Sequence, residues 1–175
     1  MARILLVYST TDGHTLEICQ RLQQVIEQHG HQVTLVSAGD ALDLDVHPFD
    51  KVVIGASIRY GKHGKQVCEF IEKNEKTLDD KPNAFFSVNV VARKPEKNQP
   101  DTNPYLKKFL RQISWQPREL AVFAGKIDYQ RYRYRDRQII RMIMWMTKGP
   151  TDPETVIDYT NWEQVDAFGQ HVSTM

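Results

Sequence analysis

A loop rich in hydroxyl side chains lies near the start of the chain and has the composition of an anion site. It reads Ser9-Thr-Thr-Asp-Gly-His-Thr15 and stands between an apolar run and a helical pattern. The first N–H groups and the dipole of a helix both face a ligand at its N-terminus. The loop holds no lysine and no GxGxxG motif, so the patterns of nucleotide hydrolases and dinucleotide sites are both absent. A monophosphate held by hydroxyls and backbone suits FMN; simple capping of the helix is the alternative. The candidate residues are Ser9, Thr10, Thr11, Asp12, Gly13, His14 and Thr15.

A second unusual segment lies late in the chain and is basic, aromatic and rich in Met. From Lys126 to Lys148 it holds seven Lys/Arg and two Asp, a net charge of +5, whereas the other residues carry −4. Its stretch Ile139–Met146 is apolar on nearly every side. Such a combination is typical of an element at a membrane surface or of an adaptable hydrophobic binding surface. Burial of Ile139–Met146 in the core and nucleic-acid binding by the Tyr/Arg run are the alternatives.

The elements that must position these segments are short buried strands alternating with amphipathic helices. Apolar runs predict strands at Ile4–Tyr8, Gln32–Val36, Val52–Ala56, Ala84–Val88 and Leu120–Ala124. Continuous apolar runs indicate strands covered on both faces, as in parallel α/β sheets. A capping box, Thr160-x-x-Glu163, predicts the start of the last helix. We therefore predict one α/β domain over 1–175, with a doubly wound five-stranded parallel sheet, helices on both faces and a long insert at about 126–150 before the last helix. Ligands bind at the carboxyl ends of the strands in such sheets.

The composition is that of an ordinary globular protein, with 26% charged residues and a net charge of +1. Nothing in the total charge points to nucleic acid. Cys19 and Cys68 lie in helical patterns without metal-ligand spacing, so we expect buried thiols, no disulfide and no metal site. No stretch reaches the ~20 apolar residues that span a bilayer. We expect a cytoplasmic protein whose segment 126–148 contacts the anionic inner face of the cell membrane peripherally, where each basic residue contributes ~1 kcal/mol of attraction.

The hydroxyl-rich loop resembles the signature of the flavodoxin family in Leu6-Val-Tyr-x-Thr10-x-x-Gly13-x-Thr15. This resemblance implies the flavodoxin-like strand order 2-1-3-4-5 and a loop that wraps the FMN phosphate. Asp12 stands where many members have threonine, and Cys19 where the pattern prefers alanine. Because a carboxylate would be repelled by phosphate, we expect Asp12 to offer its backbone N–H and to turn its side chain away. His14 replaces the usual asparagine and is expected to contribute its amide.

The resemblance narrows to one family of that fold, the bacterial menaquinone-dependent protoporphyrinogen oxidases. It is carried by Val53-Ile-Gly-Ala-Ser-Ile-Arg-Tyr-Gly61, by Phe86-Ser-Val-Asn-Val-Val-Ala-Arg-Lys-Pro-Glu96 and by the Tyr/Arg-rich insert. It implies a flavoprotein oxidoreductase of haem biosynthesis that converts protoporphyrinogen IX to protoporphyrin IX through FMN. A respiratory quinone, menaquinone or ubiquinone, is then the electron acceptor.

The same resemblance implies that the flavin ring lies between the loops after the third and fourth strands. The residues expected there are Ser57, Ile58, Arg59, Tyr60, Ser87, Val88, Asn89, Val90 and Arg93. Tyr60 is the one aromatic residue in these loops and the candidate to stack on the ring. Positive charge would stabilise an anionic reduced flavin and attract the propionates of a porphyrinogen. The residues expected to bind substrate are Arg59, Arg93, Lys94, Arg131, Arg133 and Arg135.

His63 lies close to these loops and is a candidate for moving a proton; a solvated histidine is the alternative, and no other acid or base is assigned. Three other functions remain open at this point. A non-enzymatic electron carrier is disfavoured by the basic loops and the insert. An NAD(P)H:quinone reductase of the same fold would need a nicotinamide site, which no segment indicates. A membrane-surface binding module without chemistry is the third.

Overall fold

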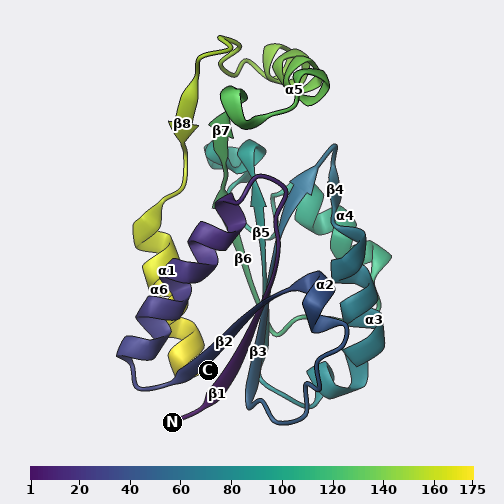
Figure 1. Cartoon of the computed structure of the whole chain (residues 1–175), viewed down its shortest axis with the longest axis vertical. Coiled ribbons are helices and arrows are strands. Elements are labelled where there is room, and N and C mark those ends of the chain that lie inside the picture. The colour runs from purple at the N-terminus through teal and green to yellow at the C-terminus, as the bar shows by residue number, and fades with distance from the viewer.

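The computed structural model describes residues 1–175 and has a central parallel sheet between two layers of helices, as Figure 1 shows. The strands are β1 (Arg3–Ser9), β2 (Gln32–Ser37), β3 (Lys51–Arg59), β5 (Asn83–Asn89) and β6 (Glu119–Ala124). They lie in the order β2-β1-β3-β5-β6, and every neighbouring pair is parallel. Counting only these five strands, this is the order that the flavodoxin resemblance implied.

The helices cover both faces because the strand side chains alternate between two apolar layers. The helices α1 (His14–Gln28) and α6 (Trp162–Thr174) lie on one face; α2 (Ala38–Ala41), α3 (Lys65–Asp79) and α4 (Pro104–Gln112) lie on the other. In β1, Ile4 and Leu6 face the first layer, whereas Leu5 and Val7 face the second. All four are fully buried. The continuous apolar runs therefore have the cause expected for them, namely burial of both faces.

Three short elements extend the carboxyl ends of the central strands. The strand β4 (Lys62–His63) turns back antiparallel on the end of β3. The single turns η1 (Val90–Arg93) and η2 (Pro95–Lys97) follow β5 directly. Asn89 ends β5 and caps η1, since its side chain accepts a hydrogen bond from the N–H of Ala92. These elements bend the chain tightly at the sheet edge where ligands are expected.

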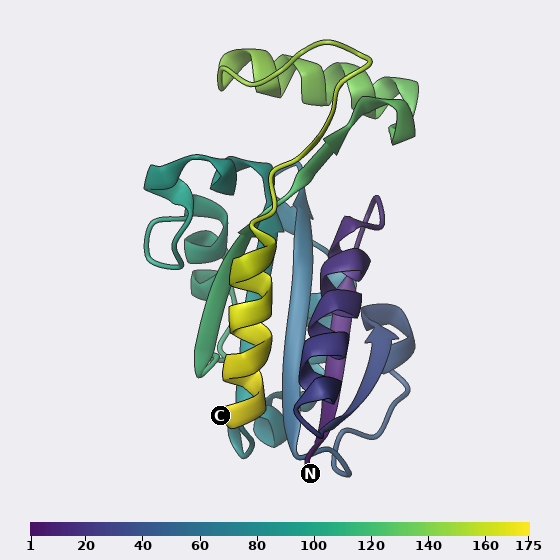
Figure 2. The same cartoon turned by 90° about the vertical axis from the view of Figure 1, so that its left-hand side faces the viewer.

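The insert forms an arm with a helix across its end. The arm is an antiparallel pair, β7 (Lys126–Asp128) with β8 (Val156–Asp158), and between them lie η3 (Tyr129–Arg131) and α5 (Tyr134–Met146). Figures 1 and 2 both show α5 beyond the carboxyl ends of the parallel strands, at the pole opposite the two termini. A small separate core of Ile127, Tyr129, Tyr132 and Met144 holds the insert together.

The residue that caps the last helix and the burial of one cysteine differ from what the sequence predicts. The cap of α6 is Asn161, whose side chain accepts the N–H groups of Glu163 and Gln164. Thr160 is not the cap, because its hydroxyl donates to the carbonyl of Ala124 at 2.7 Å. Cys19 is a buried free thiol, whereas Cys68 is only half-buried. None of the helices is both long and apolar enough to cross a membrane.

Candidate functional site

A cavity of about 480 Å³ lies between the carboxyl ends of the strands and the insert. We call its two walls the floor and the roof. The floor is formed by the loops after β1, β3 and β5, namely residues 10–15, 57–61 and 88–93. The roof is formed by insert residues Ile127, Tyr132, Ile140, Ile143, Met144 and Thr147. Lys126, Gly125 and Tyr105 complete the lining. Of the predicted cofactor residues, Thr10, Thr11, Asp12, His14, Thr15, Ser57, Ile58, Arg59, Tyr60, Val88, Asn89, Val90 and Arg93 line it.

The loop after β1 presents unpaired donors to this cavity. Gly13 precedes α1 with a φ of +91°, a left-handed conformation that favours glycine, and its N–H donates to Oγ1 of Thr10 at 2.9 Å. No side chain caps α1, so its first N–H groups lack side-chain acceptors. Thr15 is 1% exposed, and its Oγ1 has no hydrogen-bond partner. A buried hydroxyl without a partner is costly, and an oxyanion at the helix N-terminus would satisfy it.

The carboxylate of Asp12, awkward in an anion site, is neutralised by Arg59 from the loop after β3. The two side chains form a hydrogen-bonded ion pair and are 32% and 19% exposed. Arg59 Nη1 also lies 3.7 Å from Oδ2 of Asp136 in α5, and its guanidinium sits 5.2 Å from the ring centre of Tyr132. Arg59, in the loop after β3, thus contacts both the loop after β1 and the insert. Arg59 is therefore already paired with protein carboxylates.

Tyr60 lines the cavity at the edge of the roof. It has a φ of +53° and is 50% exposed, and its hydroxyl donates to Asp136. This hydrogen bond, together with desolvation, raises the pKa of Tyr60. Its aromatic ring is the one large exposed apolar surface of the floor.

The loop after β5 is held from behind by buried amides. Asn89 and Asn103 exchange hydrogen bonds of 2.9 and 3.3 Å, and Asn89 Nδ2 also donates to Ser87 Oγ at 3.1 Å. Ser87 is fully buried and does not line the cavity. Ser87, one of the predicted cofactor residues, thus lies behind the lining and contacts Asn89 and His63. Ser9 and Gly13 also lie just outside the lining.

His63, the predicted proton carrier, does not line the cavity. Its ring packs 4.6 Å from that of Phe109, and Nε2 lies 2.8 Å from Ser87 Oγ. Burial lowers the pKa of His63 to about 4, so the ring is neutral at pH 7. A neutral ring can accept the Ser87 hydroxyl hydrogen while Ser87 accepts from Asn89. His63 thus supports the floor from behind.

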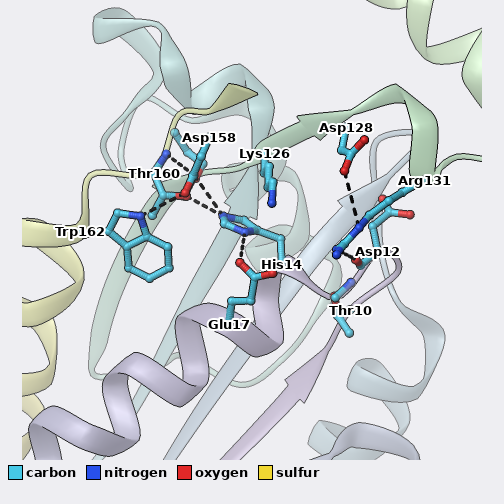
Figure 3. A network of polar contacts seen from close by, with 12 residues as sticks. Thr10, Asp12, His14, Glu17, Lys126, Asp128, Arg131, Asp158, Thr160 and Trp162 are labelled. Atoms are coloured by element: carbon cyan, nitrogen blue, oxygen red, sulfur yellow. Dashed lines mark hydrogen bonds and ion pairs between the residues drawn. The ribbon is translucent and has the colours of Figure 1, made fainter. Parts of the chain in front are cut away.

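His14 ties the floor to the base of the arm, as Figure 3 shows. Its Nε2 lies 2.6 Å from Thr160 Oγ1 and 3.5 Å from Asp158 Oδ1, and its Nδ1 lies 3.3 Å from Glu17. Burial acts to raise the pKa of Asp158, but hydrogen bonds from Thr160 and Trp162 and the proximity of His14 outweigh it and lower that pKa. The sequence predicts a contribution from the amide of His14, whereas this side-chain network joins residues too far apart in the chain for their spacing to indicate it.

Three of the five predicted substrate arginines, Arg59, Arg93 and Arg131, are bonded to groups of the protein. Arg93 lines the cavity, but donates to the carbonyls of Val90 and Thr147. Arg131 donates to the carbonyl of Asp12 at 3.3 Å and pairs with Asp128. The remaining three, Lys94, Arg133 and Arg135, do not line the cavity. Both Arg133 and Arg135 are exposed.

The helix α5 divides its apolar residues between the cavity and the outer surface. Met144 is the one buried residue of the helix, and with Ile140 and Ile143 it faces the cavity. Trp145 is 74% exposed, and Met146 and Met142 are 61% and 55% exposed. The expected alternative of a fully buried core helix is thus wrong, because the outer side of α5 remains uncovered by the rest of the chain.

Sequence reasoning missed Lys126, Tyr105 and most of the roof. Lys126 stands two residues after the end of β6, where a parallel strand delivers its loop to the ligand edge. Its position was therefore a usable signal. The roof residues had no such signal, since an apolar helix pattern does not reveal which side meets a cavity.

Comparison with known proteins gives consistent matches over nearly the whole chain. The sequence model of the flavodoxin domain family matches residues 5–154. The protoporphyrinogen IX dehydrogenase (quinone) of Escherichia coli strain K12 is 42% identical over 171 residues, which cover 98% of this chain and 94% of that protein. The protein of the same name from Leishmania major is 38% identical, over 99% and 75% of the two chains. The crystal structure of oxidised flavodoxin 1 from Bacillus cereus superposes with a TM-score of 0.55 at 13% identity, covering 99% and 98%.

Proposed function

Since the chain belongs to the flavodoxin domain family, and within it to the group of quinone-dependent protoporphyrinogen IX dehydrogenases, we propose that it binds FMN and oxidises protoporphyrinogen IX with a quinone as electron acceptor. One observation in the structure carries the proposal. The cavity joins an anion-binding loop to a roof of apolar side chains and has a volume of about 480 Å³. This combination suits a phosphorylated cofactor beside a large apolar substrate.

The floor has the donors that the FMN phosphate requires. The buried hydroxyl of Thr15 and the uncapped start of α1 both face the cavity and lack protein acceptors. Asp12 does not oppose an anion there, because Arg59 neutralises its carboxylate. When bound, FMN supplies the two-electron acceptor that the side chains themselves cannot provide. The donors of this loop would fix the phosphate, and Tyr60 would contact the ring system from the edge of the roof.

The roof would exclude water from the substrate and hold its apolar framework. Ile140, Ile143 and Met144 approach from α5, and Val90 of the floor packs against the small core of the insert. Arg93 lies at the boundary between floor and roof, with no carboxylate partner. A propionate group of the substrate could therefore pair with its guanidinium. No protein acid or base is needed in direct contact with the substrate, if water takes up the protons.

A direct assay tests this function against its two rivals. The purified protein, with its visible spectrum recorded for FMN, is mixed anaerobically with protoporphyrinogen IX, with and without a quinone. We expect porphyrin fluorescence to appear only when quinone is present. A flavin-loaded protein without such turnover would indicate an electron carrier. Rapid oxidation of NADPH by quinone in the same preparation would indicate a reductase instead.

We also propose that the protein attaches peripherally to an anionic membrane through the insert. The outer side of α5 carries Met142, Trp145 and Met146, and the exposed Arg133 and Arg135 lie at its start. An apolar side with Trp and Met next to basic residues suits the boundary between headgroups and acyl chains. The roof would then face the cavity while the other side of the same helix faces lipid. A hydrophobic quinone could thus reach the cavity from the membrane.

Vesicle flotation measures this attachment. The double variant Trp145→Ser/Met142→Ser and the variant Arg133→Gln/Arg135→Gln should both bind less to vesicles containing anionic lipid. Arg131 and Arg137 are left in place, because they donate to the carbonyls of Asp12 and Tyr129. The control, Lys107→Gln/Lys108→Gln, removes two exposed charges from α4. Equal partitioning of all variants would contradict attachment through the insert.

A further inference from the structure

We propose that Lys126 binds the phosphate of the cofactor and makes this site select FMN over unphosphorylated flavin. This rests on the proposed function, in that FMN is taken as the cofactor. The lysine comes from the insert arm, over a hundred residues after the loop that it would assist. A second, cationic component of the phosphate site therefore lies outside the flavodoxin signature.

The position of Lys126 follows from the way the arm leaves the sheet. After β6 the chain passes Gly125, whose N–H donates to the carbonyl of Asn89 at 3.1 Å, and enters β7 at Lys126. The side chain lines the same cavity as Thr10 and Thr15. Figure 3 shows it reaching from the arm toward the loop, between His14 and Asp12.

Lys126 differs from the other charged residues of the cavity in having no partner. Asp12 and Arg59 pair with each other, and His14 contacts Glu17, Asp158 and Thr160. Arg93 donates to two backbone carbonyls. The ammonium group of Lys126 makes no hydrogen bond or ion pair with any residue of the chain. It is a half-buried cation left available to a ligand.

Asp158, the carboxylate that faces Lys126 across the arm, is bonded to other partners. Asp158 lies directly opposite Lys126 in the β7–β8 pair. Its Oδ1 accepts from the Thr160 N–H at 2.9 Å, and its Oδ2 accepts from Trp162 Nε1 at 3.1 Å. His14 approaches the same carboxylate at 3.5 Å. These contacts keep Asp158 turned to α6 and leave the lysine facing the loop.

The ligand group best suited to this arrangement is a phosphate dianion rather than a substrate carboxylate. Lys126 lies above the loop in which the Thr15 hydroxyl is buried without a partner. That loop also holds the uncapped N-terminus of α1. Three kinds of donor thus line the same cavity: a hydroxyl, backbone N–H groups and an ammonium. A phosphate can accept from all three at once through its separate oxygens.

Flavin binding to the full chain tests the proposal without any turnover. The dissociation constants of FMN and riboflavin are measured for flavin-free protein by quenching of flavin fluorescence. We expect the wild type to prefer FMN, and Lys126→Met to weaken FMN binding about tenfold or more, the usual cost of a lost charged hydrogen bond. Riboflavin affinity should change less than about twofold, since it carries no phosphate. Lys126→Arg should retain most of the preference.

Salt provides a second readout, because a charge contact is screened by ions. The wild-type affinity for FMN should fall as NaCl is raised, and this dependence should be weaker in Lys126→Met. The matched control is Lys76→Met, which removes an exposed lysine from α3 far from the cavity. It should behave as the wild type for both flavins.

The outcomes separate this proposal from the proposed function. A wild type that binds neither flavin would overturn both. A wild type that prefers FMN, with Lys126→Met unchanged, would overturn only the role of Lys126. An equal loss of affinity for FMN and for riboflavin in Lys126→Met would mean that the lysine merely shapes the cavity. An unchanged FMN affinity with a raised KM for protoporphyrinogen IX would assign the lysine to the substrate.

Discussion

The floor and the roof of the cavity are built from the same chain under different physical constraints. Floor residues end buried parallel strands, and their backbone and side chains are fixed by buried hydrogen bonds such as the Asn89–Asn103 pair. The roof belongs to a helix with one buried residue, which is fixed by a small separate core and a few long side chains. The floor is thus held by many buried contacts at the edge of the main sheet, whereas the roof is held by few. Cofactor binding should depend on the floor, and substrate choice on the roof.

Excision of the roof should give the largest effect. Asp128 pairs directly with Val156 in the arm, so residues 129–155 can be replaced by Asn-Gly, the preferred two-residue hairpin turn. Lys126 and the floor are retained. The deletion removes several aliphatic side chains that would contact the substrate. Full burial of one such side chain is worth about 1.5–3 kcal/mol, so quinone-dependent porphyrin formation should fall at least a hundredfold. The FMN dissociation constant should rise by less than about tenfold. Retained turnover would show that the roof has no part in substrate binding.

Substitution of Thr15, in the floor, should weaken binding of FMN directly. In Thr15→Val the buried hydroxyl without a partner is replaced by a methyl group of similar size. FMN binding should weaken about tenfold to a hundredfold, because a hydrogen bond to a charged ligand is lost. Thermal stability of the flavin-free protein should stay equal or rise, because no protein hydrogen bond is broken.

Thr160→Val provides the matched comparison for Thr15. The Thr160 hydroxyl contacts both His14 and the carbonyl of Ala124, so its removal should lower the Tm of the flavin-free protein. A lower Tm in Thr15→Val as well would mean that its hydroxyl already has a partner within the protein.

The two walls also differ in how far the sequence predicted them. The five strands and the loop from Thr10 to Thr15 were predictable, because continuous apolar runs and a hydroxyl-rich helix start are local patterns. The strand order followed from the family resemblance. The pairing of Asp12 with Arg59 was not, since it joins residues 47 positions apart across two loops. Likewise, Arg131 and Arg137 read as free charges in the sequence, whereas the folded insert uses them to bind its own carbonyls and that of Asp12. Long side chains from an insert contact partners that no spacing reveals.

The buried support of the floor should appear as a pH dependence of stability. Burial lowers the pKa of His63 from 6.5 to about 4, so between these values the unfolded chain binds more protons than the folded one. The free energy of unfolding should therefore rise with pH from about 4 to 6.5, with a contribution of up to about 3 kcal/mol from His63. Urea denaturation at several pH values measures this dependence.

Two variants identify the residue responsible. His63→Gln keeps an acceptor for Ser87 but does not titrate, so the rise with pH should become shallower. His29→Gln removes an exposed histidine that has no carboxylate partner and should leave the rise unchanged. Identical profiles for the wild type and His63→Gln would assign the pH dependence to other groups.

The contact between floor and roof through Arg59 and Asp136 should have the smallest effect on stability. The two side chains are 19% and 31% exposed and 3.7 Å apart, so solvent screens the pair, and Asp136→Asn should cost less than about 1 kcal/mol in unfolding free energy.

Local opening of the roof is a more sensitive measure, because few other contacts hold α5 to the floor. Trypsin should cleave Asp136→Asn faster than the wild type after the exposed Arg133 and Arg135, while fragments from the floor appear at the same rate. Glu69→Gln, which removes the exposed pair with Lys65 in α3 and keeps every tryptic site, should leave both rates unchanged. Faster cleavage throughout the chain would mean that the roof and the floor open as one unit, and the contrast between the two walls would then be wrong.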